Sequence, residues 1–184
     1  FPLTSGCTAV LVTEDARRAP RELAKTAQKF QVSRIQATPS HWNELIASDI
    51  HKGNSIQVIA IGETLNPEIA EKLCHPSQTS LLHLYGTTEA PGSTGISYGE
   101  KVWTDHVSIG KPLEHSIIKI LTNELTPCPI GVPGELHIGG AGIARGYLNN
   151  PELTAEKFIH DPFSDDPSAR LYKSGDLASW NPDG

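Results

Sequence analysis

The stretch that decides the fold runs from Ile56 to Leu84 and reads IQVIAIGETLNPEIAEKLCHPSQTSLLHL. It begins with a dense apolar run, Ile56–Ile61, which is typical of a strand buried on both faces. Asn66 and Pro67 then predict the cap and first turn of a helix that continues to Leu73. The last five residues form a second short apolar run and predict another strand. Strand, helix and strand in this order indicate a parallel sheet.

The residues before this stretch follow the same alternation of strand and helix. We expect short strands over Thr8–Val12 and Ser33–Ala37, where apolar and β-branched residues gather. We expect helices over Pro20–Phe30 and from Pro39 or Ser40 to about Ala47, because proline favours the first helical turn. Residues 1–95 are therefore predicted to form a parallel α/β layer, part of a large N-terminal domain.

The pattern changes after about Gly95, where Gly and Pro separate short apolar runs. Residues 151–158 alone look helical there, with Asn150 as the cap. Residues 96–184 are therefore predicted to form a small, distorted antiparallel β-barrel or sandwich. Its strands are expected near Val102 and over Ser116–Leu121, Gly134–Ile138, Leu171–Lys173 and Asp176–Trp180.

Composition excludes several classes of function. The 184 residues carry a formal net charge of −6 and show no basic stripe, so we expect neither nucleic acid nor a membrane as partner. The three cysteines are far apart and form no CxxC pair, which favours reduced thiols in a cytoplasmic protein. The chain lacks methionine and begins in the middle of a pattern, so we expect it to be an internal piece of a longer parent protein.

Three motifs carry the chemistry, and the first is Tyr85-Gly-Thr-Thr-Glu89 at the end of a predicted strand. Ligands of open α/β sheets bind beyond the carboxyl ends of the strands. Here Tyr85 offers a flat ring for a purine, and Gly86 allows close backbone approach. Thr88 can donate a hydrogen bond to a phosphate oxygen, and Glu89 offers a hard oxygen to Mg²⁺. A helix cap or an ordinary loop remains the alternative interpretation.

The other two motifs have simple structural interpretations of their own. Gly134–Leu148 reads GELHIGGAGIARGYL and fails the G-x-G-x-x-G fingerprint, because Arg145 stands where the last glycine is needed. A strand entering a tight glycine turn explains it. In Tyr172–Leu177, Gly175 shapes a turn that presents Asp176, whose carboxylate can accept hydrogen bonds from a ribose diol. An aspartate that only satisfies its own turn is the alternative.

In this order and spacing the three motifs resemble the adenylate-forming superfamily, and most closely the adenylation domains of nonribosomal peptide synthetases. The resemblance covers essentially the whole chain. It implies an ATP-dependent, AMP-forming ligase that activates an amino acid as the aminoacyl-adenylate. The product would be loaded onto the phosphopantetheine thiol of a carrier domain. The implied partners are the amino acid or another carboxylate, and the carrier and condensation domains of the same assembly line.

The resemblance also assigns roles to single residues. It implies that Tyr85 contacts the adenine, Thr88 the α-phosphate, Glu89 the magnesium ion and Asp176 the ribose hydroxyls. Thr88 and Glu89 are then the catalytic residues, and Glu89 is the metal ligand. Further nucleotide-binding positions are implied at Gly62, Glu63, Thr64, Gly86 and Thr87. For Gly62–Thr64, a turn that starts a helix is an equally good interpretation.

Thr87 departs from the peptide-synthetase pattern, which usually has proline there. Threonine at this place is more similar to some acyl-CoA ligases and reductase-type activating domains, so these remain alternatives. A non-catalytic module that reuses the same fold is a further alternative. By position against the motifs, the substrate side chain would meet a mostly apolar pocket with one polar group, which favours a neutral, medium-sized amino acid. The pocket residues are Gln36, Ile59, Ile61, Leu84, Gly92 and Ser93.

The same comparison of motifs shows which family parts this sequence does not contain. They are the aspartate that grips the substrate amine, the Gly/Ser/Thr-rich loop with its lysine for the β- and γ-phosphates, and a C-terminal domain with a catalytic lysine. Adenylate formation depends mainly on positioning and charge stabilisation. We therefore expect the isolated chain to be inactive.

Overall fold

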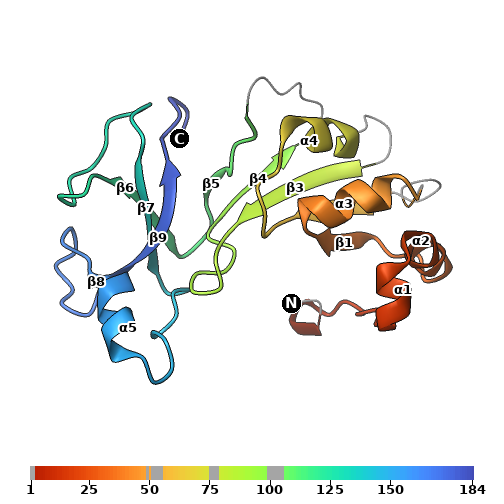
Figure 1. Cartoon of the computed structure of the whole chain (residues 1–184), viewed down its shortest axis with the longest axis horizontal. Helices are drawn as coiled ribbons and strands as arrows, with labels where there is room; N and C mark the ends of the chain where they lie inside the picture. Colours follow the sequence, from red (N-terminus) through yellow and green to blue (C-terminus); the bar gives the residue numbers. More distant parts are fainter. Residues whose placement is uncertain (1–2, 49, 51–55, 75–78, 99–105) are drawn as a thin grey trace. The chain divides into compact units, whose positions relative to one another are not determined.

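The computed structural model of the chain describes residues 3–48, 50, 56–74, 79–98 and 106–184. The chain divides into two compact units. The first unit contains Phe1–His83 and Ser97–Ser108, and the second contains Leu84–Ile96 and Ile109–Gly184. Figure 1 shows the elements along the chain. The predicted division into residues 1–95 and 96–184 stays a prediction.

The first unit is built on parallel strands, as the sequence predicts. They are β1 (Arg34–Ala37), β2 (Ile56–Ala60) and β3 (Thr79–Tyr85), and β2 pairs with both of the others. Along β2 the buried and half-buried residues alternate. Val58 and Ala60 are at most 2% exposed, and such burial is why this strand is nearly continuous in apolar residues.

The helices of the first unit are α1 (Glu14–Arg18), α2 (Pro20–Lys29), α3 (Pro39–Ile46) and α4 (Pro67–Leu73), preceded by the 3-10 turn η1 (Leu3–Ser5). Three of these four helices, α2, α3 and α4, begin at the prolines that the sequence predicts. Thr38 and Asn66 cap α3 and α4 by accepting a backbone N–H with the side-chain oxygen. Helix α3 packs between α2 and α4, as Figure 1 shows. The Trp42 indole N–H, 3.0 Å from the Ile59 carbonyl oxygen, fixes α3 on β2.

The predicted strand over Thr8–Val12 is wrong. These residues have no regular structure, and Leu11 is 93% exposed. A strand needs a neighbour for its backbone hydrogen bonds, and this segment pairs with no strand in the described part of the chain. Helix α1 follows directly, capped by Thr13. The sequence analysis did not predict this short helix.

The second unit contains an antiparallel sheet in the order β6-β7-β9-β8. Figure 1 shows β6, β7 and β9 side by side, with α5 next to β8. The strands are β6 (Ser116–Leu121), β7 (Gly134–Gly140), β8 (Phe158–His160) and β9 (Arg170–Ala178). The helix α5 (Pro151–Lys157) begins after its predicted cap Asn150.

The structure establishes a mixed α/β architecture, whereas closure of the second sheet into a barrel is not seen within residues 106–184. A short antiparallel pair of β4 (Thr94–Tyr98) with β5 (Lys111–Pro112) lies outside this four-stranded sheet. The predicted strand near Val102 lies outside the described residues. In the described part of the chain, no helix combines the length and apolar character that crossing a membrane requires.

One face of the four-stranded sheet carries the core of the second unit. Leu136 and Ile138 of β7 are 1% exposed and pack there with Phe158 and Tyr172. Tyr85 and Ala90, from the segment that follows β3, pack against the same cluster. The core therefore attaches the first motif to the sheet that carries the other two.

Candidate functional site

The first motif forms a tight loop after β3 and contains no helix, so the helix-cap alternative for it is wrong. The Ser93 N–H donates to the Tyr85 carbonyl oxygen at 2.8 Å and closes the loop. A Cβ at Gly86 would lie 2.3 Å from the Gly92 nitrogen and 2.7 Å from the Ala90 oxygen. Only glycine fits at this position, because the loop folds back on its own backbone.

Glu89 is held by the second motif. The Tyr147 hydroxyl donates to Glu89 Oε1 at 2.6 Å, and the Ala144 N–H donates to the Glu89 carbonyl oxygen at 2.7 Å. The Tyr147 hydrogen bond is the main cause that lowers the pKa of Glu89 below its ordinary value, so the carboxylate is anionic at neutral pH. The same contact raises the pKa of Tyr147.

Asp176 of the third motif meets Tyr85 of the first. The Tyr85 hydroxyl donates to Asp176 Oδ2 at 2.6 Å, across 91 residues of sequence. Burial, followed by this hydrogen bond, raises the pKa of the Tyr85 phenol, which therefore stays protonated. Asp176 is exposed, and its Oδ1 makes no hydrogen bond within the described part of the chain. One carboxylate oxygen is therefore open to a ligand.

The two threonines between these carboxylates differ in their surroundings. Thr88 is exposed, and its hydroxyl makes no hydrogen bond to the described residues, so it is accessible to a ligand oxygen. The Thr87 hydroxyl is buried and makes no hydrogen bond of good geometry to the described residues. It lies close enough to Glu89 to contribute to the lowered pKa of that carboxylate.

The Gly62–Thr64 segment lies in the first unit and has a structural role there. The Ser40 N–H and hydroxyl both donate to Glu63 Oε2, at 3.0 and 2.5 Å. These bonds at the start of α3 are the main cause that lowers the pKa of Glu63. Gly62 has a φ of 93°, which favours glycine, and Thr64 is exposed. The turn is therefore bonded to the start of α3, whereas the helix that follows it along the chain, α4, begins only at Pro67. The nucleotide-binding role of Gly62–Thr64 stays a prediction.

The predicted pocket residues fall into two groups. In the first unit Gln36 pairs with Ile59 across β1 and β2, and Ile61 follows two residues later, so all share one face of the sheet. In the second unit Leu84 and Gly92 are half-buried. Ser93 is 2% exposed and donates its hydroxyl to the Ala90 carbonyl oxygen, so this hydroxyl already has a partner inside the loop.

The chemistry of Glu89 fits a magnesium ion that is held mostly by phosphate. Its carboxylate is anionic and half-buried, but no group of three or more acidic, His or Cys side chains suited to a metal gathers in the described residues. Mg²⁺ bound to nucleotides commonly takes one or two carboxylates together with substrate phosphates and water. A single glutamate is consistent with such a site.

Two residues contact the site that the sequence analysis did not single out. Tyr147 binds Glu89, and the Glu135 carboxylate accepts the Gly175 N–H beside Asp176 at 3.1 Å. Both belong to Gly134–Leu148, which was interpreted as supporting structure. Glu135 stands in β7 between the buried residues Gly134 and Leu136, and this burial is known only from the folded sheet.

Comparison with known proteins agrees with the arrangement of the three motifs. Residues 1–148 match the family model described as AMP-binding enzyme. The dimodular nonribosomal peptide synthase of Bacillus subtilis is 37% identical over 184 residues, which cover 100% of this chain and 8% of that protein. Bacitracin synthase 1 of Bacillus licheniformis is 37% identical over 99% of this chain and 4% of its own length.

Solved structures show the same fold. The four-domain nonribosomal peptide synthetase AB3403, in its holo form with AMP and glycine, matches with a TM-score of 0.83 and 30% identity over 97% of this chain and 13% of that one. IdnL1 matches with a TM-score of 0.88 and 22% identity, over 99% of this chain and 39% of that one. The chain thus spans a small part of the curated relatives that it matches. On the family model and the relatives together, this chain belongs to the AMP-binding enzyme family.

Proposed function

We propose that this chain forms part of an adenylation domain that uses ATP to activate an amino acid as the aminoacyl-adenylate, within a longer parent synthetase. The observation that carries the proposal is the hydrogen bond from Tyr85 to Asp176. It joins two motifs that are 91 residues apart, and both have the chemistry of a nucleotide site. The relatives named above, peptide synthetases at 37% identity, support the assignment.

Each side chain then has a defined task. Asp176 accepts hydrogen bonds from the ribose hydroxyls, through its open Oδ1 and in competition with Tyr85 at Oδ2. The Tyr85 ring lies against the adenine, and the exposed Thr88 hydroxyl donates to a phosphate oxygen. Glu89 holds Mg²⁺, which when bound supplies positive charge to the phosphate oxygens. The carboxylate of the amino acid attacks the α-phosphorus and displaces pyrophosphate.

The finer features of the proposal follow the family resemblance. The second sheet would belong to a small barrel, the adenylate would pass to phosphopantetheine on a carrier domain, and the protein would work in the cytoplasm. The Gln36, Ile59, Ile61 group supports a preference for neutral substrates, because an unpaired charge on an apolar face is costly. A carrier domain and a condensation domain are the proposed partners.

Thr87 supports a second candidate, an acyl-CoA ligase or reductase-type activating domain. Its buried hydroxyl, which a proline would lack, lies close enough to Glu89 to contribute to the lowered pKa of that carboxylate. The chemistry at the nucleotide is the same in both candidates. Assays with amino acids and with carboxylic acids that lack an amine distinguish them.

The experiment that tests the proposal uses ATP–pyrophosphate exchange in the full-length parent. We expect Asp176→Ala to raise the KM for ATP roughly 10- to 100-fold, because hydrogen bonds to a charged group contribute about 1.5–3 kcal/mol. Glu89→Gln is expected to weaken magnesium binding, and therefore to lower the turnover number more than it lowers the affinity for ATP. Glu124→Gln is the matched control, because this exposed glutamate lies in the turn after β6. Wild-type exchange in both site variants would exclude the assignment.

A further inference from the structure

Asp176 lies in an irregularity of the strand pairing between β7 and β9. Glu135 of β7 pairs with Leu177, and His137 pairs with Lys173. One residue of β7, Leu136, therefore faces three residues of β9, from 174 to 176. Such bulges redirect a side chain and must be stabilised by other contacts. This one directs Asp176 out of the regular pairing.

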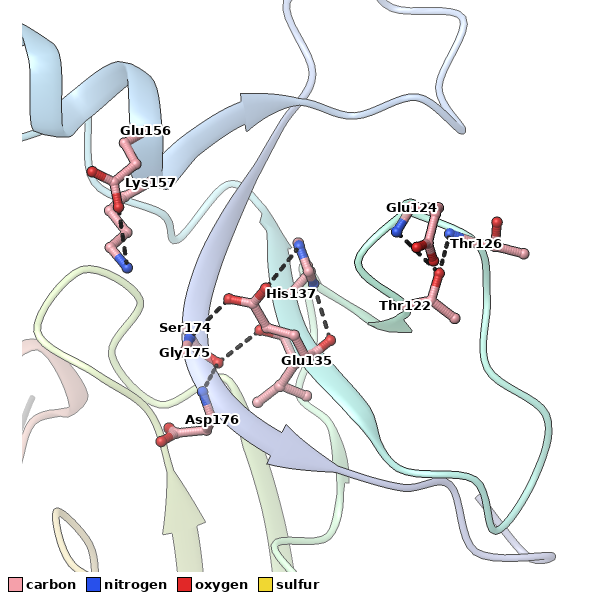
Figure 2. A network of polar contacts seen from close by, with 11 residues as sticks. Thr122, Glu124, Thr126, Glu135, His137, Glu156, Lys157, Ser174, Gly175 and Asp176 are labelled. Carbon is pink, nitrogen blue, oxygen red and sulfur yellow. Dashed lines mark hydrogen bonds and ion pairs between the residues drawn. The ribbon is translucent and has the colours of Figure 1, made fainter.

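Three hydrogen bonds close the bulge, and Figure 2 shows them. The Ser174 hydroxyl donates to the Leu136 carbonyl oxygen at 2.7 Å and accepts from the Asp176 N–H at 3.1 Å. The Gly175 N–H donates to Glu135 Oε1 at 3.1 Å. Glu135 thus satisfies a backbone group that the bulge removes from the regular ladder, and a charged acceptor strengthens this bond.

The Glu135 carboxylate lies beside a buried histidine. Its other oxygen, Oε2, lies 3.9 Å from His137 Nε2, and the side chains of Glu135 and His137 are 23% and 1% exposed. His137 Nε2 makes no hydrogen bond to the described residues, and its Nδ1 lies 3.0 Å from the Glu135 carbonyl oxygen. Both ring nitrogens therefore face oxygens of the same residue. Figure 2 shows the imidazole beside Glu135 on β7.

From this geometry we infer that Glu135 is a positioning residue for the ribose-binding carboxylate. It fixes the Ser174–Asp176 bulge through the Gly175 N–H, and the bulge places Asp176 in the orientation that the diol requires. The inference rests on the proposed function, because it takes Asp176 as the ribose ligand. A glutamate that served only the stability of the sheet would not affect how the protein distinguishes nucleotides by their sugar.

The test measures that discrimination directly in the full-length parent. ATP is compared with 2′,3′-dideoxyadenosine triphosphate, which keeps the phosphates and adenine but lacks both ribose hydroxyls. The readout is the ratio of kcat/KM for the two nucleotides in adenylate formation. The variants are Glu135→Ala, Glu135→Gln and Asp176→Ala, with Glu124→Ala as the control at an exposed glutamate in the turn after β6.

We expect the wild type and the control to prefer ATP by roughly 10- to 100-fold. Asp176→Ala should bring the ratio to about 1, and Glu135→Ala should fall within about threefold of it, with the KM for the amino acid unchanged. Glu135→Gln keeps an oxygen for the Gly175 N–H and should retain an intermediate ratio. It also keeps the test available if Glu135→Ala does not fold.

Two results overturn the inference in distinguishable ways. If Asp176→Ala loses the discrimination while both Glu135 variants keep the wild-type ratio, Glu135 does not position Asp176 and the proposed function stands. If the Glu135 variants lose kcat/KM equally for both nucleotides, the conclusion is the same, because an equal loss indicates that Glu135 has a structural role alone. If Asp176→Ala itself keeps the wild-type ratio, the ribose assignment fails and the inference fails with it.

Discussion

Among single residues, Asp176 and Glu89, the proposed ligands of the ribose and the metal, each accept a hydrogen bond from a tyrosine hydroxyl. Tyr85 donates to Asp176 and Tyr147 donates to Glu89, both at 2.6 Å. The consequences differ, because Tyr147 lowers the pKa of Glu89, while the phenol of Tyr85 is affected most by burial. The charge of Glu89 is therefore coupled to the second motif.

This coupling predicts a pH-dependent effect of Tyr147→Phe on stability. The variant keeps the ring that packs edge-on against Phe158 at 5.7 Å and removes only the hydroxyl. Because the pKa of Glu89 is lowered in the folded chain, its stabilisation is present at neutral pH and is lost as the pH falls through the folded pKa. We expect a loss of about 1 kcal/mol at pH 7, below the range of about 1.5–3 kcal/mol for bonds to charged groups, because the pair is half-exposed.

Urea unfolding of the 184-residue chain at several pH values between neutral and acid measures this effect. In a Glu89→Gln background the same substitution should show little dependence on pH, because the titrating carboxylate is gone. An equal loss at neutral and at acid pH would show that the hydroxyl does not act through the charge of Glu89.

Among the helices, strands and loops, the turn after β3 leaves no room for a side chain at Gly86. Gly86→Ala places a methyl group 2.3 Å from the Gly92 nitrogen, and backbone atoms cannot move aside at low cost. We expect a destabilisation of roughly 1–3 kcal/mol, the range for overpacking, measured by the urea midpoint. Gly142→Ala is the matched control, because its Cβ would meet nothing within 4 Å. A Gly86→Ala variant as stable as Gly142→Ala would contradict the observed loop geometry.

The sequence predicted well those elements whose signals are local. Helices α3, α4 and α5 begin at a proline behind a capping side chain, and each cap forms in the structure. Elements decided by distant partners were predicted less well. Strand β8 has three residues, its partner β9 is ten residues away, and no local pattern specifies this pairing. The single strand β9 was expected as two, because its bulge resembles a turn in the sequence.

The same difference between local signals and distant partners holds for the residues of the candidate site. Tyr85, Glu89 and Asp176 were identified because each stands in a motif, and the structure places Tyr85 on Asp176. Tyr147 and Glu135 were missed, because the partner of each lies 58 or 40 residues away and their roles depend on the folded sheet. For Glu63 the resemblance implied a nucleotide contact, which stays a prediction, and the structure shows its carboxylate bonded to Ser40 at the start of α3.

For the molecule as a whole, we predict that the isolated 184-residue chain forms no acyl-adenylate. The family's Gly/Ser/Thr-rich loop for the β- and γ-phosphates is not found in this sequence, and the loss of one stabilising contact in such a reaction costs ~10²–10³ in rate. ATP–pyrophosphate exchange by the purified chain, with a panel of amino acids, measures this. Robust exchange that depends on the amino acid would contradict the prediction.

The division into two units has a consequence for exchanging parts between members of this family. The chain passes from one unit to the other after His83, returns after Ile96 and passes over again after Ser108. No single junction in the sequence separates the two units. A chimera joined at one position between residues 84 and 108 would therefore build at least one unit from segments of two different parents. A hybrid that keeps each unit intact requires Leu84–Ile96 to be inherited together with Ile109–Gly184.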